Sequence, residues 1–533
     1  MTSAPAAAIP APLPTDRRSL LDRLAEPRTW DLAVVGGGAT GLGVALDAAA
    51  RGFSVVLVES DDFAKGTSSR ATKLVHGGVR YLAQGNIALV REALHERTTL
   101  LANAPHLAQP LPFVMPAYRW WEQPFYGAGL KAYDLLAGRA GLGATDFLGR
   151  ARTAERLPGL RTDGLAGGVQ YWDGQFDDAR LALALARTAA REGALVVNHV
   201  AARGLVHEDG KVAGLDCEDT ETGQRYRLRA RAVVNATGVW VDALRQQDGE
   251  ATGRPAAPIV SPSQGVHLVV DRDFLPSRHA LLVPRTADGR VLFAVPWLGK
   301  LILGTTDTPR SDLPPEPEPF RAEVEFILSE SARYLQRAPG AADVRSVWVG
   351  LRPLVRPEAQ ARDTKTISRE HTVLASASGL VSVTGGKWTT YRAMAEDVLQ
   401  KCFDAGLLPT RRAGVTERLR LVGAPPSSAT SLADAQGWHS YGTEEAAVRA
   451  LPGAHRVLGG GLTEAMVRFA ARHEYARTIE DMLARRWRLL FLDARVAAAT
   501  AAAVASVLEE ETATDPQLAA FLALAHQYGR LPD

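Results

Sequence analysis

The feature that most constrains this chain is a glycine turn between a short apolar strand and an alanine-rich helix near its start. The turn carries Gly36, Gly38 and Gly41, and a second strand ends at Glu59. Gly36 permits the tight turn, Gly38 lets the backbone approach a pyrophosphate, and Gly41 lets the helix pack closely on the strand. N–H groups at the helix start attract phosphates, and Glu59 can accept hydrogen bonds from both ribose hydroxyls. The sequence therefore predicts an adenine dinucleotide site, and the Glu59 carboxylate disfavours the 2′-phosphate of NADP.

Length and composition limit the classes of function that remain. A chain of 533 residues predicts two or three domains, and a net charge of +2 without a basic tract argues against a nucleic-acid partner. Cys217 and Cys402 form no CxxC motif, so we expect two buried thiols in a reducing compartment and no metal site. No apolar run reaches about 18 residues, so we expect no membrane-spanning helix. We expect a cytoplasmic protein with an N-terminal tail over residues 1–29.

Two later glycine elements distinguish between the common dinucleotides. One buried strand ends in Asn235-Ala-Thr-Gly238, and another ends in Thr384-Gly-Gly386 ahead of a helix. An NAD dehydrogenase completes its nucleotide domain in contiguous βαβ units, whereas an extended FAD lies between segments that are distant in sequence. The spacing therefore predicts FAD. The sequence contains no second complete fingerprint, which argues against a separate NAD site.

Several longer motifs occur in one order along the chain. The most specific is Thr67-Ser-Ser-Arg-Ala-Thr-Lys73-Leu-Val-His76-Gly-Gly-Val-Arg80-Tyr81-Leu. The others are Ala104-Pro-His-Leu107, Tyr171–Arg180, Gly304-Thr-Thr-Asp307, Gly350-Leu-Arg352-Pro-Leu, Gly385–Tyr391 and Glu480–Arg486. Through these motifs, residues 30–500 resemble the FAD-dependent, aerobic, quinone-linked glycerol-3-phosphate dehydrogenases.

The resemblance implies an α/β fold with a glucose-oxidase-like FAD-binding domain of the Rossmann type. It also implies an antiparallel β-rich substrate cap and a helical C-terminal domain. The hydrophobic pattern agrees, because strands predominate over 259–310 and helices predominate beyond 430. The expected boundaries are 30–110, 165–258 and 352–405 for the FAD-binding domain, 111–164 and 259–351 for the cap, and 406–533 for the helical domain.

The same resemblance implies which residues contact FAD. A Gly-Gly pair between a strand and a helix can lay its N–H groups against the carbonyl side of the flavin. The expected cofactor-binding residues are Gly36, Gly38, Gly41, Glu59, Thr67, Ser68, Ser69, Lys73, His76, Gly78, Ala236, Thr237, Gly238, Gly385, Gly386, Lys387 and Thr389.

A phosphate-bearing substrate needs converging cations, and arginine presents a planar fork that matches phosphate. Arg80 and Arg352 lie in apolar turns bounded by glycine or proline, whereas Arg369 lies in a polar segment. Tyr81 adds a hydroxyl donor beside Arg80. Lys387 stands at a helix start, where a cation is mildly unfavourable, so a role with the substrate or the reduced flavin is favoured. We expect all five residues to bind the substrate, and Arg352 and Lys387 to take part in catalysis as well.

Oxidation of a secondary alcohol requires a group that accepts the hydroxyl proton while the carbon-bound hydrogen leaves as hydride. A neutral imidazole suits this step. His267 lies on an apolar strand of the expected cap, and His76 lies in the glycine loop after the first βαβ unit. The resemblance places His267 beside the flavin, so we predict His267 as the base, with Arg352 as its electrostatic partner.

An aromatic cluster between residues 119 and 131 suggests a contact with lipid. Tryptophan and tyrosine with flanking cations are typical of peripheral proteins at a bilayer surface, although a packed cap helix would also explain them. A quinone acceptor is lipid-soluble, which favours the membrane contact. The cluster comprises Trp120, Trp121, Phe125 and Tyr126, with the cations Arg119, Lys131 and Arg139 near them.

The sequence thus predicts an enzyme that oxidises sn-glycerol 3-phosphate to dihydroxyacetone phosphate by hydride transfer to FAD and passes electrons to a membrane quinone. We expect it to bind peripherally to the cytoplasmic face of the membrane. The sequence does not decide between a monomer and a homodimer. One alternative is an oxidase that uses oxygen and makes hydrogen peroxide. Two others are an enzyme like the amino-acid oxidases, which would need one carboxylate-binding arginine, and a flavin-binding scaffold without turnover.

Overall fold

The nucleotide-binding layer begins with β1 (Thr29–Val35), α2 (Ala39–Ala50) and β2 (Val55–Val58). The last four residues of β1 and all of β2 are apolar and buried, which is the pattern of central strands in a parallel sheet. The two strands pair in parallel. The computed structural model describes the chain except for residues 1–10, 79–85, 287–288, 356–370, 429 and 533.

Strands from distant parts of the chain complete this first sheet. β10 (Arg225–Asn235) pairs in parallel with β1, and β18 (Leu380–Gly385) pairs in parallel with β10. The carboxyl ends of the three strands therefore lie at one edge of the sheet. The strand order is β17-β18-β10-β1-β2-β7, and a β8–β9 hairpin joins through β10. The other elements of this layer are β7 (Leu195–Val197), β8 (Val200–Glu208), β9 (Lys211–Asp219), β17 (His371–Ala375), α7 (Asp178–Arg191), α8 (Val241–Ala251) and α10 (Tyr391–Asp404).

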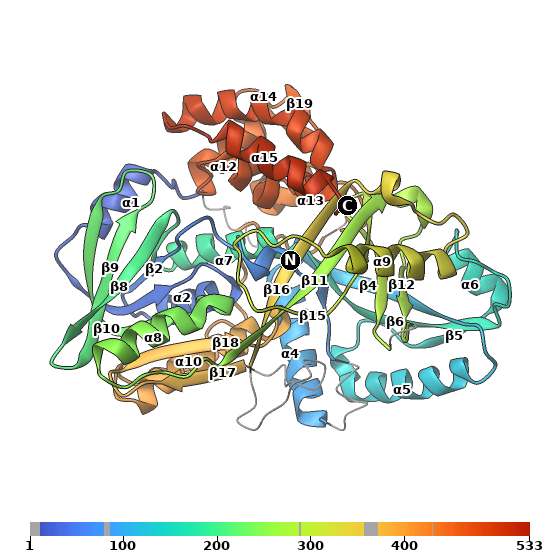
Figure 1. Ribbon diagram of the computed structural model, residues 1–533, viewed down its shortest axis with the longest axis horizontal. Helices are drawn as coiled ribbons and strands as arrows, with labels where there is room; N and C mark the ends of the chain where they lie inside the picture. The colour runs from blue at the N-terminus through green and yellow to red at the C-terminus, as the bar shows by residue number, and fades with distance from the viewer. Residues whose placement is uncertain (1–10, 79–85, 287–288, 356–370, 429, 533) are drawn as a thin grey trace, which may run out of the picture.

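A second, largely antiparallel sheet of ten strands lies beside the first (Figure 1). Its order is β15-β11-β14-β13-β12-β4-β6-β3, with β16 beside β11 and β5 beside β6. Its strands are β3 (Leu74–Val75), β4 (Ala108–Ala117), β5 (Asp146–Gly149), β6 (Gly167–Phe176), β11 (Val260–Asp271), β12 (Ala280–Val283), β13 (Leu292–Trp297), β14 (Lys300–Gly304), β15 (Thr308–Pro309) and β16 (Ser346–Val355); its helices are α4 (Ile87–Asn103), α5 (Glu122–Ala137), α6 (Arg150–Arg156) and α9 (Arg321–Tyr334).

The sheet pairing differs from the expected boundaries at β3 and β6. The prediction placed β3 in the FAD-binding domain, within residues 30–110, but β3 pairs with β6 in the second sheet. The prediction placed residues 165–258 in the FAD-binding domain, but β6 pairs with β4 over its full length, from Gly167 opposite Ala117 to Phe176 opposite Ala108. The ten ladder positions tie β6 to the cap sheet. The chain therefore returns to the nucleotide-binding layer only at α7.

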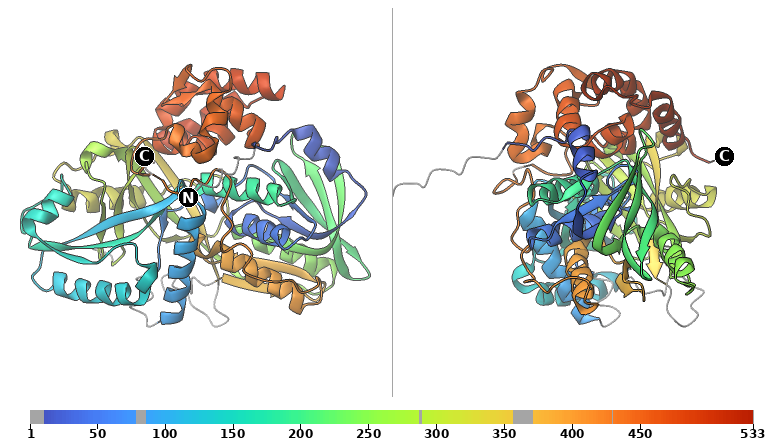
Figure 2. Two further views of the ribbon diagram at one scale, coloured as in Figure 1. Left: turned by 180° about the vertical axis from the view of Figure 1, so that it is seen from behind. Right: turned by 90° about the vertical axis from the view of Figure 1, so that its left-hand side faces the viewer.

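The C-terminal part is helical and lies across both sheets, at the top of Figure 1 and in both views of Figure 2. Its buried side chains form one hydrophobic core with residues of the cap sheet, including Trp297 and Trp348. Cys217 and Cys402 are both free and buried, and no helix among the described residues is long and apolar enough to cross a bilayer. The remaining elements are α1 (Arg17–Leu24), α11 (Glu445–Arg449), α12 (Glu464–His473), α13 (Leu489–Leu492), α14 (Ala494–Thr512), α15 (Leu518–Gly529), β19 (Val457–Gly459), β20 (Leu462–Thr463) and a π-helical turn at Asp481–Arg486.

Candidate functional site

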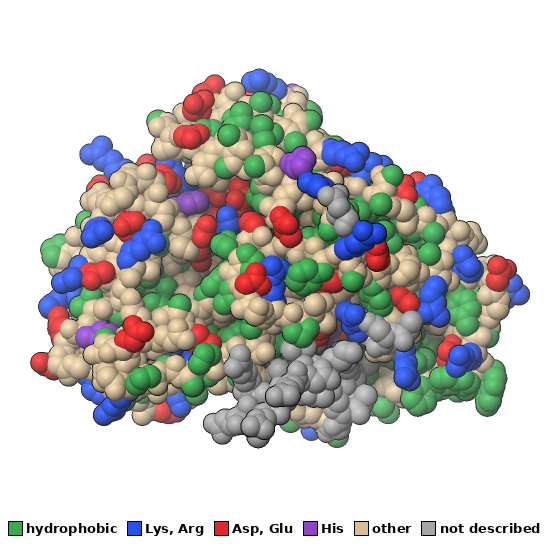
Figure 3. Space-filling view, viewed as in Figure 1, with side chains coloured by type: hydrophobic (Ala, Val, Ile, Leu, Met, Phe, Trp, Pro, Cys, Tyr) green, Lys and Arg blue, Asp and Glu red, His purple; other side chains and the backbone are tan. Residues whose placement is uncertain are grey.

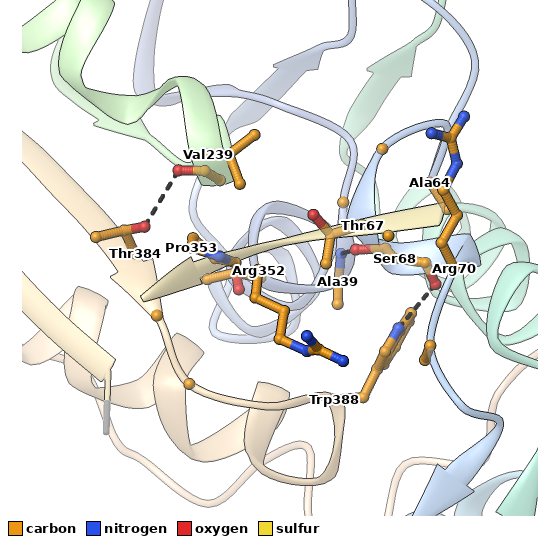
Figure 4. A pocket seen from close by; sticks show the side chains of 18 of the residues that line it. Ala39, Ala64, Thr67, Ser68, Arg70, Val239, Arg352, Pro353, Thr384 and Trp388 are labelled. Carbon is orange, nitrogen blue, oxygen red and sulfur yellow. Dashed lines mark hydrogen bonds between the residues drawn. The ribbon is translucent and has the colours of Figure 1, made fainter. Parts of the chain in front are cut away.

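A cavity of about 840 Å³ runs along the edge where β1, β10 and β18 end, and it extends to the cap strands β11 and β16 (Figure 4). A ligand site at the carboxyl ends of parallel strands is the general rule for open α/β sheets. Predicted residues that line the cavity are Gly36, Gly38, Glu59, Thr67, Ser68, His76, Ala236, Thr237, Gly238, His267, Arg352, Gly385, Gly386, Lys387 and Thr389.

The first glycine turn has the geometry that a dinucleotide requires. Gly36 has φ +109°, and a Cβ there would lie 2.6 Å from the carbonyl oxygen of Ala236. A Cβ on Gly41 would lie 1.9 Å from the Gly36 carbonyl oxygen, so this residue allows α2 to pack on β1 without itself lining the cavity. Gly38 faces the cavity, and a Cβ there would lie 3.1 Å from Ser68 Oγ.

Glu59 stands at the end of β2, where the fingerprint requires an acidic residue. Its Oε2 accepts a hydrogen bond from the Gly37 N–H at 2.6 Å, and its Oε1 accepts one from the Asp61 N–H at 3.0 Å. Burial nevertheless raises the pKa of Glu59 above its usual value. Its position in the cavity wall suits the ribose contact that the sequence predicts.

The second and third glycine elements are tied to one another. Asn235 accepts a hydrogen bond from the Thr237 hydroxyl at 2.7 Å, which closes the turn after β10. Thr384 donates to the carbonyl oxygen of Gly238 at 3.1 Å, as the dashed line in Figure 4 marks. Gly385 and Gly386 have φ of +82° and +74°, which side chains rarely adopt. Three backbone turns therefore converge on one cavity.

Some predicted cofactor residues lie behind the cavity wall instead of in it. Ser69 and Lys73 are buried but do not line the cavity, and neither does Gly78. The Lys73 Nζ donates to the Ser69 carbonyl oxygen and to Asp178 Oδ2, both at 2.7 Å. Burial lowers the pKa of Lys73 to about 7, against the opposing effect of Asp178. Lys73 thus braces the loop from inside the protein.

The cap contributes a cation and a histidine to the cavity. Arg352, on β16, donates to the Gln264 carbonyl oxygen and to Thr305 Oγ1, each at 3.2 Å, and its Nη1 lies 3.4 Å from Asp307 Oδ1. Lys387 follows the Gly-Gly turn and lines the same cavity. Arg80, Tyr81 and Arg369 lie outside the described residues.

His267 lies on β11 and is only 2% exposed. Its Nε2 is 2.9 Å from Thr72 Oγ1, and its ring stacks on Trp348 with centroids 4.0 Å apart. Burial, followed by the positive charges of Arg352 and Lys73, holds the pKa of His267 well below its usual value. The ring is therefore neutral at ordinary pH.

The sequence reading missed several contributors to the cavity. Trp388 Nε1 donates to the Ser68 carbonyl oxygen at 2.8 Å, and Thr72 supports His267. Asp307 and Thr305 hold Arg352, and both belong to the Gly304-Thr-Thr-Asp307 motif, which had no assigned role. That motif was the available signal, but its meaning depends on the pairing of β14 and β16 with β11.

The residues present fit FAD. A Cβ at Gly36 or Gly386 would meet a neighbouring residue within 2.6 Å. Gly38, where the fingerprint predicts a close approach of the backbone to the pyrophosphate, opens on the cavity. Among the described residues, no group of three or more His, Cys, Asp or Glu side chains is arranged to hold a metal ion. The two sheets, the βαβ unit and this cavity define an FAD-dependent oxidoreductase.

Comparison with known proteins supports this class and narrows it. Residues 31–392 match the family described as FAD dependent oxidoreductase, and residues 414–518 match the C-terminal domain of alpha-glycerophosphate oxidase. The mitochondrial glycerol-3-phosphate dehydrogenase of Homo sapiens is 42% identical over 91% of this chain and 71% of its own length. That of Saccharomyces cerevisiae is 37% identical over 94% and 89%.

A solved structure agrees with the sequence relatives. The glycerol-3-phosphate dehydrogenase of Bacillus halodurans, complexed with FAD, has a TM-score of 0.76 and 28% identity, covering 96% of this chain and 98% of its own. The chain belongs to the family of FAD-dependent glycerol-3-phosphate dehydrogenases. The predicted resemblance, fold class and FAD cofactor are thereby confirmed.

Proposed function

We propose that this chain oxidises sn-glycerol 3-phosphate to dihydroxyacetone phosphate and passes the electrons to a membrane quinone. The observation that carries the proposal is that Arg352, Lys387 and His267 line the same cavity as the three glycine turns. The names of the relatives at 37–42% identity support the substrate. Bound FAD supplies the acceptor for the hydride that leaves the alcohol carbon.

Arg352 and Lys387 are the proposed cations for the substrate phosphate. The Gln264 carbonyl, Thr305 and Asp307 hold the guanidinium at the cavity wall, so little side-chain freedom is lost when a phosphate binds. A guanidinium presents its N–H groups in one plane, a geometry that matches the oxygens of a phosphate. Binding through the phosphate also positions the alcohol carbon, so glycerol should be a very poor substrate.

The hydroxyl proton needs an acceptor, and two histidines line the cavity. His267 is the first candidate, because it stays neutral and its Nε2 is oriented by Thr72. The lowered pKa that keeps it neutral also makes it a weak acceptor. His76, half-buried in the same cavity wall, is the second candidate. Substitution of each histidine by glutamine, followed by rapid-mixing measurement of flavin reduction, distinguishes the two.

The reaction is tested by mixing the purified FAD-loaded protein with sn-glycerol 3-phosphate without oxygen. We expect the flavin absorbance to bleach, and glycerol to leave it unchanged at the same concentration. A soluble quinone should then restore the absorbance faster than dissolved oxygen does. Faster reoxidation by oxygen, with formation of hydrogen peroxide, would instead make the protein an oxidase. The match of residues 414–518 to the C-terminal domain of alpha-glycerophosphate oxidase is the reason to test this alternative. No bleaching by glycerol 3-phosphate would refute the substrate.

The proposed quinone acceptor requires a contact with the bilayer, and α5 presents the surface for it. Trp120 is 85% exposed, Phe125 67% and Leu135 84%. The exposed residues of α5 include an apolar stripe at helical spacing. Figure 3 shows hydrophobic side chains gathered at the lower right, over α5 in Figure 1. The stripe is Phe125, Ala128, Ala132 and Leu135. Trp121 precedes α5 directly and is exposed, as are Arg119 and Lys131.

We propose that α5 lies in the headgroup region on the cytoplasmic face of the membrane, with its apolar stripe toward the acyl chains. Wild-type protein should sediment with anionic vesicles. The double variant Phe125→Ser with Leu135→Ser should remain in solution while keeping its flavin and its activity with a soluble acceptor. A matched control is Val457→Ser, which removes another exposed apolar side chain, 64% exposed, on the helical domain. Equal vesicle binding by the α5 variant and wild type would refute the surface.

A further inference from the structure

The loop between β2 and β3, residues 60–73, forms one wall of the cofactor cavity and is termed the cofactor loop here. Its cavity side includes Ala64, Gly66, Thr67, Ser68 and Thr72. It has no strand and only a short 3-10 turn at Thr67–Ser69, so regular backbone hydrogen bonds do little to fix it. Its geometry must come from contacts on its other side.

The first of these contacts is a buried carboxylate. Asp62 is 1% exposed, and Arg485 and Arg486 both donate to it, with Arg486 Nη2 at 2.9 Å from Oδ1. Arg486 also donates from Nε to the Glu474 carbonyl oxygen at 3.0 Å, which fixes the guanidinium within the helical domain. Asn198 adds a bond to Asp62 at 3.1 Å. Two arginines of the C-terminal domain therefore hold the start of the cofactor loop.

The second contact is made to the loop backbone. Arg488 is fully buried, and its Nη2 donates to the Ser69 carbonyl oxygen at 2.8 Å. Its Nη1 donates to the Ala484 carbonyl oxygen at 2.7 Å. Lys73 donates to the same Ser69 oxygen from the opposite end of the loop. The preceding residue, Ser68, lines the cavity, and its hydroxyl accepts a hydrogen bond from the N–H of Ala39 at the start of α2.

A third contact lies at the edge of the interface. Lys65 Nζ is 3.0 Å from Glu480 Oε2, and Glu480 also pairs with Arg485 at 2.7 Å. These positive neighbours lower the pKa of Glu480 to about 2, although burial opposes them. All three contacts come from one short segment, residues 480–488, which includes the π-helical turn.

We propose that residues 480–488 are a positioning clamp that pre-orders the cofactor loop, so that the affinity for FAD depends on the C-terminal domain. Buried ion pairs are weak evidence for stability by themselves, because desolvation offsets much of the attraction. In this protein the ion pairs fix the geometry of the cofactor loop before FAD binds. Without them, FAD binding would have to order the loop, and the lost entropy would lower the affinity. Linkage makes the effect reciprocal, so bound FAD holds the clamp in place.

The test compares two buried arginines at the same domain interface. Arg486→Gln removes a clamp residue, whereas Arg187→Gln removes the control pair Arg187–Glu444, joined by two bonds of 2.6 Å between α7 and the C-terminal domain. The control pair does not contact the cofactor loop. FAD is titrated into each apoprotein, and the thermal unfolding of each apoprotein is measured in parallel. Both variants should unfold at lower temperature than wild type.

We expect the dissociation constant for FAD to rise at least tenfold in Arg486→Gln and to stay within about twofold in Arg187→Gln. Arg486→Lys, which keeps the charge, should recover part of the affinity. Should Arg486→Gln fail to fold, Glu480→Gln at the interface edge should raise the dissociation constant about threefold. Equal changes in the Arg486 and Arg187 variants, or wild-type affinity in the clamp variants, would overturn the proposal.

Hydrogen exchange of the wild-type chain provides a readout that needs no variant. FAD should slow amide exchange in residues 480–488, which do not line the cavity, as well as in the cofactor loop. The cap helix α6, which packs on β4, β5 and β6, serves as the reference. Protection confined to the cavity wall, with residues 480–488 exchanging as fast as in the apoprotein, would contradict the coupling.

Discussion

Substitution of Gly38 by alanine should separate cofactor binding from folding. The backbone of Gly38 has φ −83°, an ordinary value, so alanine adds no backbone strain. The new Cβ would meet Ser68 Oγ at 3.1 Å, a tight contact that a hydroxyl can relieve by a small shift. Destabilisation of the apoprotein should therefore be no more than about 1 kcal/mol.

The same methyl group should weaken FAD binding strongly, because the glycine fingerprint predicts that the pyrophosphate lies against this turn. If it displaces two charge-assisted hydrogen bonds, each contributing about 1.5–3 kcal/mol, the loss is about 3–6 kcal/mol. That corresponds to roughly a hundredfold to ten-thousandfold in the dissociation constant. Gly38→Val should abolish binding.

Gly41→Ala is the matched control, because its Cβ would lie 1.9 Å from a backbone oxygen and α2 would have to move. We expect Gly41→Ala to lower the unfolding temperature of the apoprotein severely, and Gly38→Ala to lower it only slightly. FAD titration followed by flavin fluorescence gives the affinity, and calorimetry gives the stability. The reasoning is refuted if Gly38→Ala binds FAD like wild type, or if it destabilises the apoprotein as much as Gly41→Ala does.

Three further outcomes are expected. Arg352→Lys should raise the Michaelis constant for glycerol 3-phosphate about tenfold or more, because the planar fork is lost; an unchanged constant would remove Arg352 from the phosphate site. If His267 is the base, His267→Gln should slow flavin reduction by a factor of about 10²–10⁴. The rate of the wild-type protein should fall with acid only well below pH 6.5, because the pKa of His267 is lowered. If the variant is only a few-fold slower, His76 becomes the proposed base. Glu480 has a pKa of about 2 in the folded state against 4.5 ordinarily, so the stability that its ionised form contributes is complete above pH 4.5 and disappears as the pH falls toward 2. Glu480→Gln should therefore make the free energy of unfolding less dependent on pH in that window. An unchanged pH dependence would contradict the ion pairs of the clamp.

Local pattern was sufficient to locate the three glycine turns that line the cavity. Each of the three turns follows a buried apolar strand, and each contains a glycine that the backbone needs for a positive φ or a close approach. The parallel pairing of β10 with β1 and of β18 with β10 then brings the turns together. The sequence alone did not predict which strands pair. However, turns that are distant in sequence can contact one cofactor only if their strands lie side by side in one sheet.

Side-chain direction was not predictable at the same level. Lys73 lies in the most specific motif of the chain, yet it points away from the cavity toward Asp178. A motif indicates that a residue has a role, but it does not show on which side of the loop the side chain lies. The predicted boundary at residue 165 failed at β6 for a related reason, because the sequence of a strand does not say which of two sheets it joins.

The clamp illustrates how far such non-local contacts extend. Asp62 meets Arg486 across 424 positions of sequence, and no periodicity or spacing marks either residue as a partner of the other. The Glu480–Arg486 motif pointed to the segment, and its resemblance to the family placed it in the helical C-terminal domain. The contacts of Arg485, Arg486 and Arg488 with the cofactor loop give that domain a physical reason to accompany the FAD-binding domain. A loop without regular structure can line a cofactor cavity only if something behind it fixes its geometry, and here that support comes from the other end of the chain.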